Sequence, residues 1–331
     1  MQTGETHADE PTRTGAAVSA DGSAGEGDPA GHRRSPGPLL LALIGAVCAV
    51  LGLLPWIVTG MRLPIQNVWD GPPPAEGMPI ALLPFSQYAV TLIIAVLVTG
   101  SLAAGAVTRL LRHRTGFRLW PVVLGVASVQ VFALVQTTLT VEDGIMQRRE
   151  AVFYVVGLAA GTAFTIALGL VVMILVARAP VGVATVAIAV IAYPASRWIT
   201  GLVVPFGSEA MATPFQFAVS AYFPWVSAVL FGVLLAWCGL RPLIRIVSWV
   251  IALALLWLMP ALFTAMGSAL GTRVLATRPA EMLDYGVEVF GAAIGGLADQ
   301  GRLLVVALAI GLVGTGLREL IARSKGVRSA V

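Results

Sequence analysis

Apolar runs of about twenty residues recur from Leu39 to the C-terminus, and no other feature constrains the fold as strongly. An α-helix needs roughly 20 such residues to cross the hydrocarbon core of a bilayer, which is about 30 Å thick. The composition agrees, because 57% of the 331 residues are hydrophobic and only 11% are charged. The alternating apolar and polar runs of a membrane β-barrel do not occur in the sequence. The sequence therefore predicts an all-α integral membrane protein.

We predict about eight transmembrane helices, at residues 39–59, 88–107, 119–140, 151–177, 181–204, 220–240, 243–266 and a last one that ends near 317. If the N-terminus lies in the cytoplasm, the cytoplasmic segments hold fourteen of the arginines and lysines and the outer segments hold six. This asymmetry follows the rule that cytoplasmic loops are the more basic ones. We therefore expect both termini in the cytoplasm.

Two short patterns occur twice in the chain, in the same order. The pattern WIVTG from Trp56 resembles WITG from Trp198, and PFSQYAV from Pro84 resembles PFQFAV from Pro214. The two spacings are 142 and 130 residues, so four predicted helices separate the copies. Chance similarity between apolar stretches is the alternative. We favour a duplication, and an even number of helices per copy makes the two four-helix repeats parallel.

The expected domain organisation has four parts, which are a disordered cytoplasmic tail at 1–37, a first four-helix repeat at 38–180, a second at 181–318 and a short basic cytoplasmic tail at 319–331. The first part is polar and cannot bury enough apolar surface to fold. Arg33 and Arg34 precede the first apolar run, so a cleaved export signal competes with a retained helix. We favour the retained helix because the run is too long for a signal.

The last predicted helix has two alternative descriptions. Residues 303–317 would reach only about 22 Å, which is less than the bilayer core. One alternative is an outer interfacial helix at 279–297 followed by a short tilted span. The other is a span from Glu288 to Leu317 that Asp299 and Arg302 interrupt in its middle. Broken helices with charges near the midplane are a feature of transporters.

The candidate polar path through the membrane centres on Arg197, which falls inside a predicted span with Tyr193 and Thr200 on the same helix face. A charge at that depth costs on the order of 3 kcal/mol. Arg197 would hold an anionic group or pair with Asp299, or its side chain would reach out to the headgroups. The further candidates for the path are Gln130, Thr137, Asp299 and Arg302.

The predicted outer loops contribute two more candidates, Trp69 and Asp70, which could contact a cation or a partner. Enzyme chemistry has little support. The only histidines are His7, His32 and His113, and no set of residues has the spacing of a metal site or of a Ser-His pair. We predict no catalytic residue, no metal and no cofactor.

Two functions fit these features. The first is a transporter or permease-like subunit, with a path between two pseudo-symmetric halves. The second is a scaffold or assembly protein of the cell envelope that acts through its outer loops and has no path. Arginine outnumbers lysine twenty to one, which is typical of GC-rich bacteria. We therefore expect a bacterial plasma membrane protein whose partners are lipid and envelope or transporter subunits, not nucleic acid.

Overall fold

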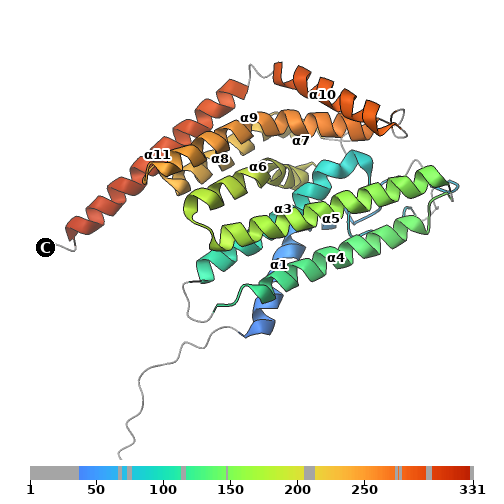
Figure 1. Ribbon diagram of the computed structural model, residues 1–331, viewed down its shortest axis with the longest axis horizontal. Helices are drawn as coiled ribbons and strands as arrows, with labels where there is room; N and C mark the ends of the chain where they lie inside the picture. The colour runs from blue at the N-terminus through green and yellow to red at the C-terminus, as the bar shows by residue number, and fades with distance from the viewer. Residues whose placement is uncertain are drawn as a thin grey trace, which may run out of the picture. The chain divides into compact units, whose positions relative to one another are not determined.

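The computed structural model describes residues 37–65, 69–72, 77–112, 117–146, 148–204, 213–272, 275, 278–295 and 300–328. Within these ranges the chain is mainly helical, and the only strand-like backbone pairings are two isolated bridges, Arg62 with Ile80 and Trp69 with Ile145. The prediction of an all-α chain is confirmed for this part. The helices are α1 Pro38–Gly52, α2 Leu54–Ile57, η1 Gln87–Ala89, α3 Val90–Leu111, α4 Trp120–Glu142, α5 Arg149–Arg178, α6 Val181–Val203, α7 Pro214–Ser220, α8 Phe223–Cys238, α9 Ile244–Gly271, α10 Pro279–Gly295 and α11 Gln300–Arg328 (Figure 1).

Six helices of the described chain are long and apolar enough to cross a membrane, namely α3 with η1, α4, α5, α6, α9 and the part of α11 that ends at Ser324. Two of the predicted spans correspond to shorter apolar helices, α1 with 15 residues and α8 with 16. At 1.5 Å per residue these reach only about 22 to 24 Å. The multi-pass character is therefore confirmed, while the number of eight spans stays a prediction.

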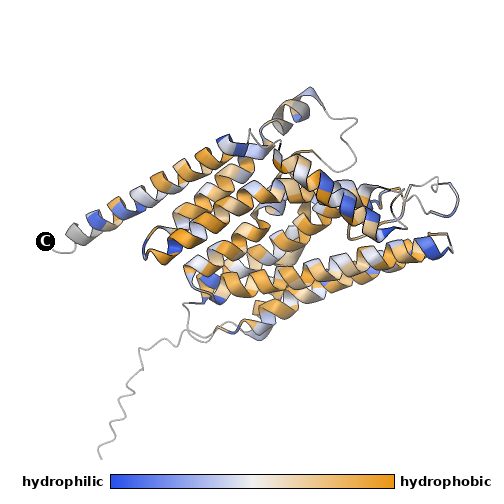
Figure 2. Cartoon of the chain, turned by 45° about the horizontal axis from the view of Figure 1, so that its top comes forward, coloured by the Kyte–Doolittle hydropathy of each residue, from blue (hydrophilic) through white to orange (hydrophobic). Residues whose placement is uncertain are grey.

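Hydrophobic residues make up most of the long helices (Figure 2), and many of their large side chains are exposed. Phe132, Phe153 and Phe164 each keep about two thirds of their surface exposed, at 65%, 69% and 70%. In water, an apolar surface of this extent would drive aggregation, whereas in a bilayer it contacts acyl chains. A lipid environment therefore follows from the surface as well as from helix length.

Small residues set the closest helix contacts. Gly125 of α4 lies against the backbone of Ala42 in α1, and Gly45 of α1 lies against Val122 of α4, with no room for a Cβ atom at either glycine. Such glycines let transmembrane helices approach closely. Gly157 and Gly161 of α5 make no such contact in the described chain, because no atom lies within 4 Å of a Cβ built at either position.

The helices pack in two groups with the same pattern of neighbours. In the first group α1 contacts α3 and α4, α5 contacts α3 and α4, and α3 contacts α4. In the second group α6 contacts α8 and α9, α11 contacts α8 and α9, and α8 contacts α9. Replacing α1, α3, α4 and α5 by α6, α8, α9 and α11 converts the first set of contacts into the second. The groups meet mainly where α6 packs against α3 and α5 (Figure 1).

The segment between α2 and α3 is fixed to the ends of the helices by hydrogen bonds. The Trp56 indole donates to the Ala81 carbonyl at 2.8 Å. The Leu83 amide donates to the Thr137 hydroxyl at 2.9 Å, and the neighbouring Leu82 amide donates to the Gln136 side chain at 2.9 Å. Leu83 itself is fully buried. This loop is therefore part of the folded core in its described residues.

Candidate functional site

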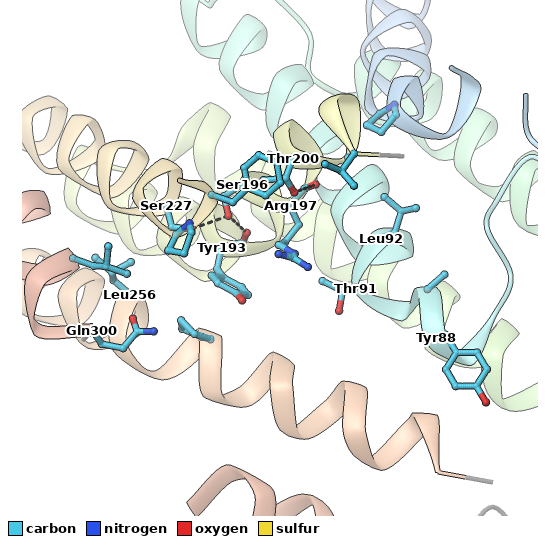
Figure 3. Close-up of a pocket in the computed structure, with 18 residues that line it drawn as sticks. Tyr88, Thr91, Leu92, Tyr193, Ser196, Arg197, Thr200, Ser227, Leu256 and Gln300 are labelled. Carbon is cyan, nitrogen blue, oxygen red and sulfur yellow. Dashed lines mark hydrogen bonds between the residues drawn. The ribbon is translucent and has the colours of Figure 1, made fainter. Parts of the chain in front are cut away.

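A cavity of about 500 Å³ opens between the two groups of helices (Figure 3). The first group contributes residues from α2, η1 and the start of α3, and the second contributes residues from α6, α8, α9 and α11. The volume falls in the range of pockets that hold small molecules. The polar residues that line the cavity are Tyr88, Thr91, Tyr193, Ser196, Arg197, Thr200, Ser227 and Gln300.

Arg197 is the one charged residue among the described residues that line this cavity. Its side chain extends from α6 toward the space between Tyr193 and Thr91, which belong to different groups of helices (Figure 3). Arg197 lies sixteen residues after Val181 at the start of α6, so the two are about 24 Å apart along the helix axis. That distance is shorter than the bilayer core, so the Cα atom of Arg197 would fall within a span that begins at Val181.

The structure brings together the three residues that the spacing on one helix predicted. Tyr193, Arg197 and Thr200 all line the cavity. The Tyr193 ring contacts the Phe263 ring of α9, with centroids 5.3 Å apart. The Thr200 hydroxyl donates to the Arg197 carbonyl at 2.9 Å, a bond within its own helix. Thr200 therefore contributes an oxygen with acceptor capacity to the cavity wall, while the Arg197 guanidinium contributes the donors.

Two serines join α6 to α8 at the wall of the cavity. The Ser227 hydroxyl donates to the Ser196 hydroxyl at 2.8 Å, and Ser196 donates in turn to the Tyr193 carbonyl at 2.6 Å (Figure 3). Both serines are buried. The sequence did not identify these two serines as cavity residues. The only indication was that Ser196 directly precedes Arg197 in the chain. The short chain of hydroxyls fixes the part of α6 from which Arg197 projects.

Gln300 closes the cavity at the start of α11, near Leu256 of α9 (Figure 3). Its Oε1 atom is buried and has no hydrogen-bond partner among the residues that the structure describes. A buried amide oxygen without a partner costs about 1–3 kcal/mol, so this position favours a bound donor such as water or a solute. The preceding candidate, Asp299, lies outside the described residues. Arg302 is exposed on α11 and is not among the residues of the cavity wall.

The other predicted path residues have structural partners away from the cavity. The Gln130 amide donates to the Leu97 carbonyl at 2.9 Å and to the Ser101 hydroxyl at 3.2 Å, and so joins α4 to α3. Thr137 accepts the Leu83 amide, as described above. Both side chains are buried within the first group of helices. The structure therefore does not place Gln130 or Thr137 on a path with Arg197.

The two outer-loop candidates pack against the turn between α4 and α5. The Asp70 amide donates to the Gly144 carbonyl at 2.9 Å. The Trp69 ring covers Gly144 so closely that a Cβ atom there would overlap it. These contacts give the Trp69 ring a packing role.

The polar groups on the described part of the cavity wall are hydrogen-bond donors and acceptors, with a single charge. The cavity offers one guanidinium, several hydroxyls and an amide, and no carboxylate occurs among its described wall residues. The described chain contains no group of three His, Cys, Asp or Glu side chains that could hold a metal ion. This set of groups suits a small solute with a negative charge or several hydrogen-bond acceptors. No protein family model matches the chain, and neither a curated protein nor a solved structure matches it.

Proposed function

We propose that this chain is a transporter or permease-like subunit that binds a small anionic solute at Arg197, on a path between two halves of the membrane domain. The observation that carries the proposal is the Arg197 guanidinium in a cavity of about 500 Å³ whose wall comes from both groups of helices. In this proposal the chain has eight spans in two parallel four-helix repeats, and both termini lie on the cytoplasmic side of a bacterial plasma membrane.

The matching neighbour patterns support the two repeats. A duplicated four-helix unit retains its internal packing, so each helix and its copy have corresponding neighbours. The two groups share five such contacts in the same order. The repeated tryptophans also act alike in donating their indole protons to backbone carbonyls, Trp56 to Ala81 and Trp198 to Gly52. Trp198 makes its bond across the junction of the two groups.

The distribution of arginines supports the topology. Arg109 and Arg112 bond to carbonyls at the end of α5, and Arg245 and Arg318 bond to carbonyls at the end of α8. Arg109 also lies over the ring of Trp237 near the end of α8, 5.0 Å from its centroid, so these basic helix ends share one side of the bundle. Under the positive-inside rule this side is cytoplasmic, and the cavity with Arg197 lies toward the outer side.

The energetic cost of Arg197 supports a functional role. A charged side chain at membrane depth costs about 3 kcal/mol, and such residues generally face a water-filled space or a partner. The described wall contains no acidic partner for Arg197. A bound anion would supply the missing charge and would also explain why the cavity is polar on its α6 side. Pairing with Asp299 is the competing explanation.

The test uses charged thiol reagents. Thr91→Cys, in a background with Cys48→Ala and Cys238→Ala, places a thiol on the cavity wall opposite Arg197. We expect a negatively charged methanethiosulfonate to react faster than a positively charged one of similar size. Adding Arg197→Gln should reduce that ratio about tenfold, because the guanidinium attracts the anionic reagent. Faster reaction of the cationic reagent, or an unchanged ratio with Arg197→Gln, would contradict an anion site.

The second candidate function is an envelope scaffold that acts through its outer loops. The described part of the loop between α2 and η1 favours it, because Ile65 and Ile80 keep 70% and 54% of their surfaces exposed while Leu83 is fixed to α4. A scaffold needs no water-filled cavity. If the Thr91→Cys thiol reacts with neither reagent in the folded protein, this second function becomes the better account.

A further inference from the structure

A second concave site lies at the opposite end of α6 from Arg197. Its volume is about 560 Å³, and we call it the basic groove. Val181 at the start of α6 is part of its wall, so the groove is about 24 Å from Arg197 along this helix. The residues that line it are Val181, Val233, Ala236, Trp237, Arg245, Gly314 and Arg318.

Two arginines from different helices converge on the basic groove. Arg245 at the start of α9 donates from Nη1 to the Cys238 carbonyl at 2.8 Å. Arg318 of α11 donates from Nη1 to the carbonyls of Ala236 at 3.1 Å and Trp237 at 2.7 Å. These bonds fix both guanidinium groups beside the end of α8. They use only one of the three nitrogens in each group, so Nε and Nη2 keep donors for a ligand.

Neither Arg245 nor Arg318 forms an ion pair with a carboxylate in the part of the chain that the structure describes. The hydrogen bonds of Arg245 and Arg318 all go to backbone carbonyls. Arg109 adds a third positive charge, because its guanidinium carbon lies 5.0 Å from the centre of the Trp237 ring. Clustered guanidinium groups with donors remaining are the arrangement that proteins use to bind phosphate groups.

An apolar surface leads from the arginines along α8. Val229 and Val233 are four residues apart on one helix face, and 45% and 57% of their surfaces are exposed. The level of the groove matches a membrane interface, because Arg318 lies eighteen residues, or about 27 Å, beyond Gln300 on α11. Trp237 adds an aromatic side chain of the type found at such interfaces. An acyl chain would therefore pass over the valines while its headgroup reached the arginines.

We propose that the basic groove binds an anionic phospholipid, with the phosphate held by Arg245 and Arg318 and an acyl chain along Val229 and Val233. Basic pockets between transmembrane helices bind such headgroups in general. The bound lipid connects α8, α9 and α11 at one membrane face. This site is independent of the cavity at Arg197, and its test does not depend on transport.

The experiment measures equilibrium binding of dioctanoyl phosphatidylglycerol to the full-length protein in a non-ionic detergent. We expect saturable binding that weakens with salt, and binding of dioctanoyl phosphatidylcholine at least tenfold weaker. Arg318→Gln and Arg245→Gln should each weaken phosphatidylglycerol binding about fivefold. Arg112→Gln is the matched control, since Arg112 also bonds to helix-end carbonyls, through Nη1 to Ala177 at 3.1 Å, but does not line the groove. It should bind as the unmodified protein does.

A further variant keeps the proposal testable if the arginine variants fail to fold. Val233→Trp fills the apolar part of the groove from an exposed position, and it should weaken phosphatidylglycerol binding without changing any arginine. Equal binding of the two lipids would overturn the proposal, as would equal weakening in Arg112→Gln. Displacement of the lipid by inorganic phosphate at the same concentration would also overturn it, because the ligand would then be a free anion.

Discussion

Replacing Thr137 with valine isolates one hydrogen bond that fixes the loop between α2 and α3. The two side chains have nearly the same shape, so packing is retained while the acceptor for the Leu83 amide is removed. That bond is 2.9 Å long, and Leu83 and Thr137 are both fully buried. A buried amide that loses its partner costs about 1–3 kcal/mol. Hydrogen exchange at the Leu83 amide should therefore accelerate roughly 5- to 150-fold.

Thr138→Val is the matched control for this prediction. The Thr138 hydroxyl donates to the Leu134 carbonyl within its own helix, at 2.8 Å. Its removal leaves no amide without a partner, so exchange at Leu83 should stay within about twofold of the unmodified protein. Mass spectrometry of peptides covering residues 80–86 measures both variants. If Thr137→Val leaves exchange at Leu83 unchanged, Thr137 does not fix the loop. The alternative that Thr137 lines a polar path would then be the better explanation of this residue.

Three further substitutions test the helix contacts, one of them as a control. Gly125→Val should lower the stability of the protein by about 1–3 kcal/mol, because α1 must move away at Ala42. The measurement is the unfolding temperature in detergent. Gly161→Val is the control and should leave that temperature unchanged, since no atom lies within 4 Å of a Cβ at this site. Trp198→Phe should cost about 1 kcal/mol by removing the indole bond to the Gly52 carbonyl, 2.7 Å long. Equal unfolding temperatures for the two glycine variants would contradict the contact assigned to Gly125. An unchanged stability of the Trp198→Phe variant would contradict the role assigned to the indole bond.

Helix positions were largely predictable because the length of an apolar run directly reflects the thickness of a bilayer. The predicted span 151–177 corresponds to α5 Arg149–Arg178, for example. The predicted span 220–240 is shortened at both ends to α8, which has Pro224 in its first turn and ends before Gly239. Gly239 has a φ of 69°, a conformation that glycine adopts easily and that terminates the helix.

The candidate site was predictable only in part. Tyr193, Arg197 and Thr200 share one helix face, so their spacing was enough to associate them. Thr91, Ser227 and Gln300 come from three other helices, and no rule of spacing connects them to Arg197. The roles of Gln130 and Thr137 were open for a related reason: the same polar side chain can line a path or join two elements, and only its hydrogen-bond partners decide between these roles.

If the cavity at Arg197 belongs to a path across the membrane, solutes must be able to reach it from both sides. The most direct test measures modification of the Thr91→Cys thiol by a membrane-impermeant reagent in vesicles of each orientation, with Cys48 and Cys238 replaced by alanine. The proposed path requires reaction from both sides, because a transported solute must reach its site from one side and leave it on the other. Reaction from the outer side alone would show a closed surface cavity and would contradict the transport account.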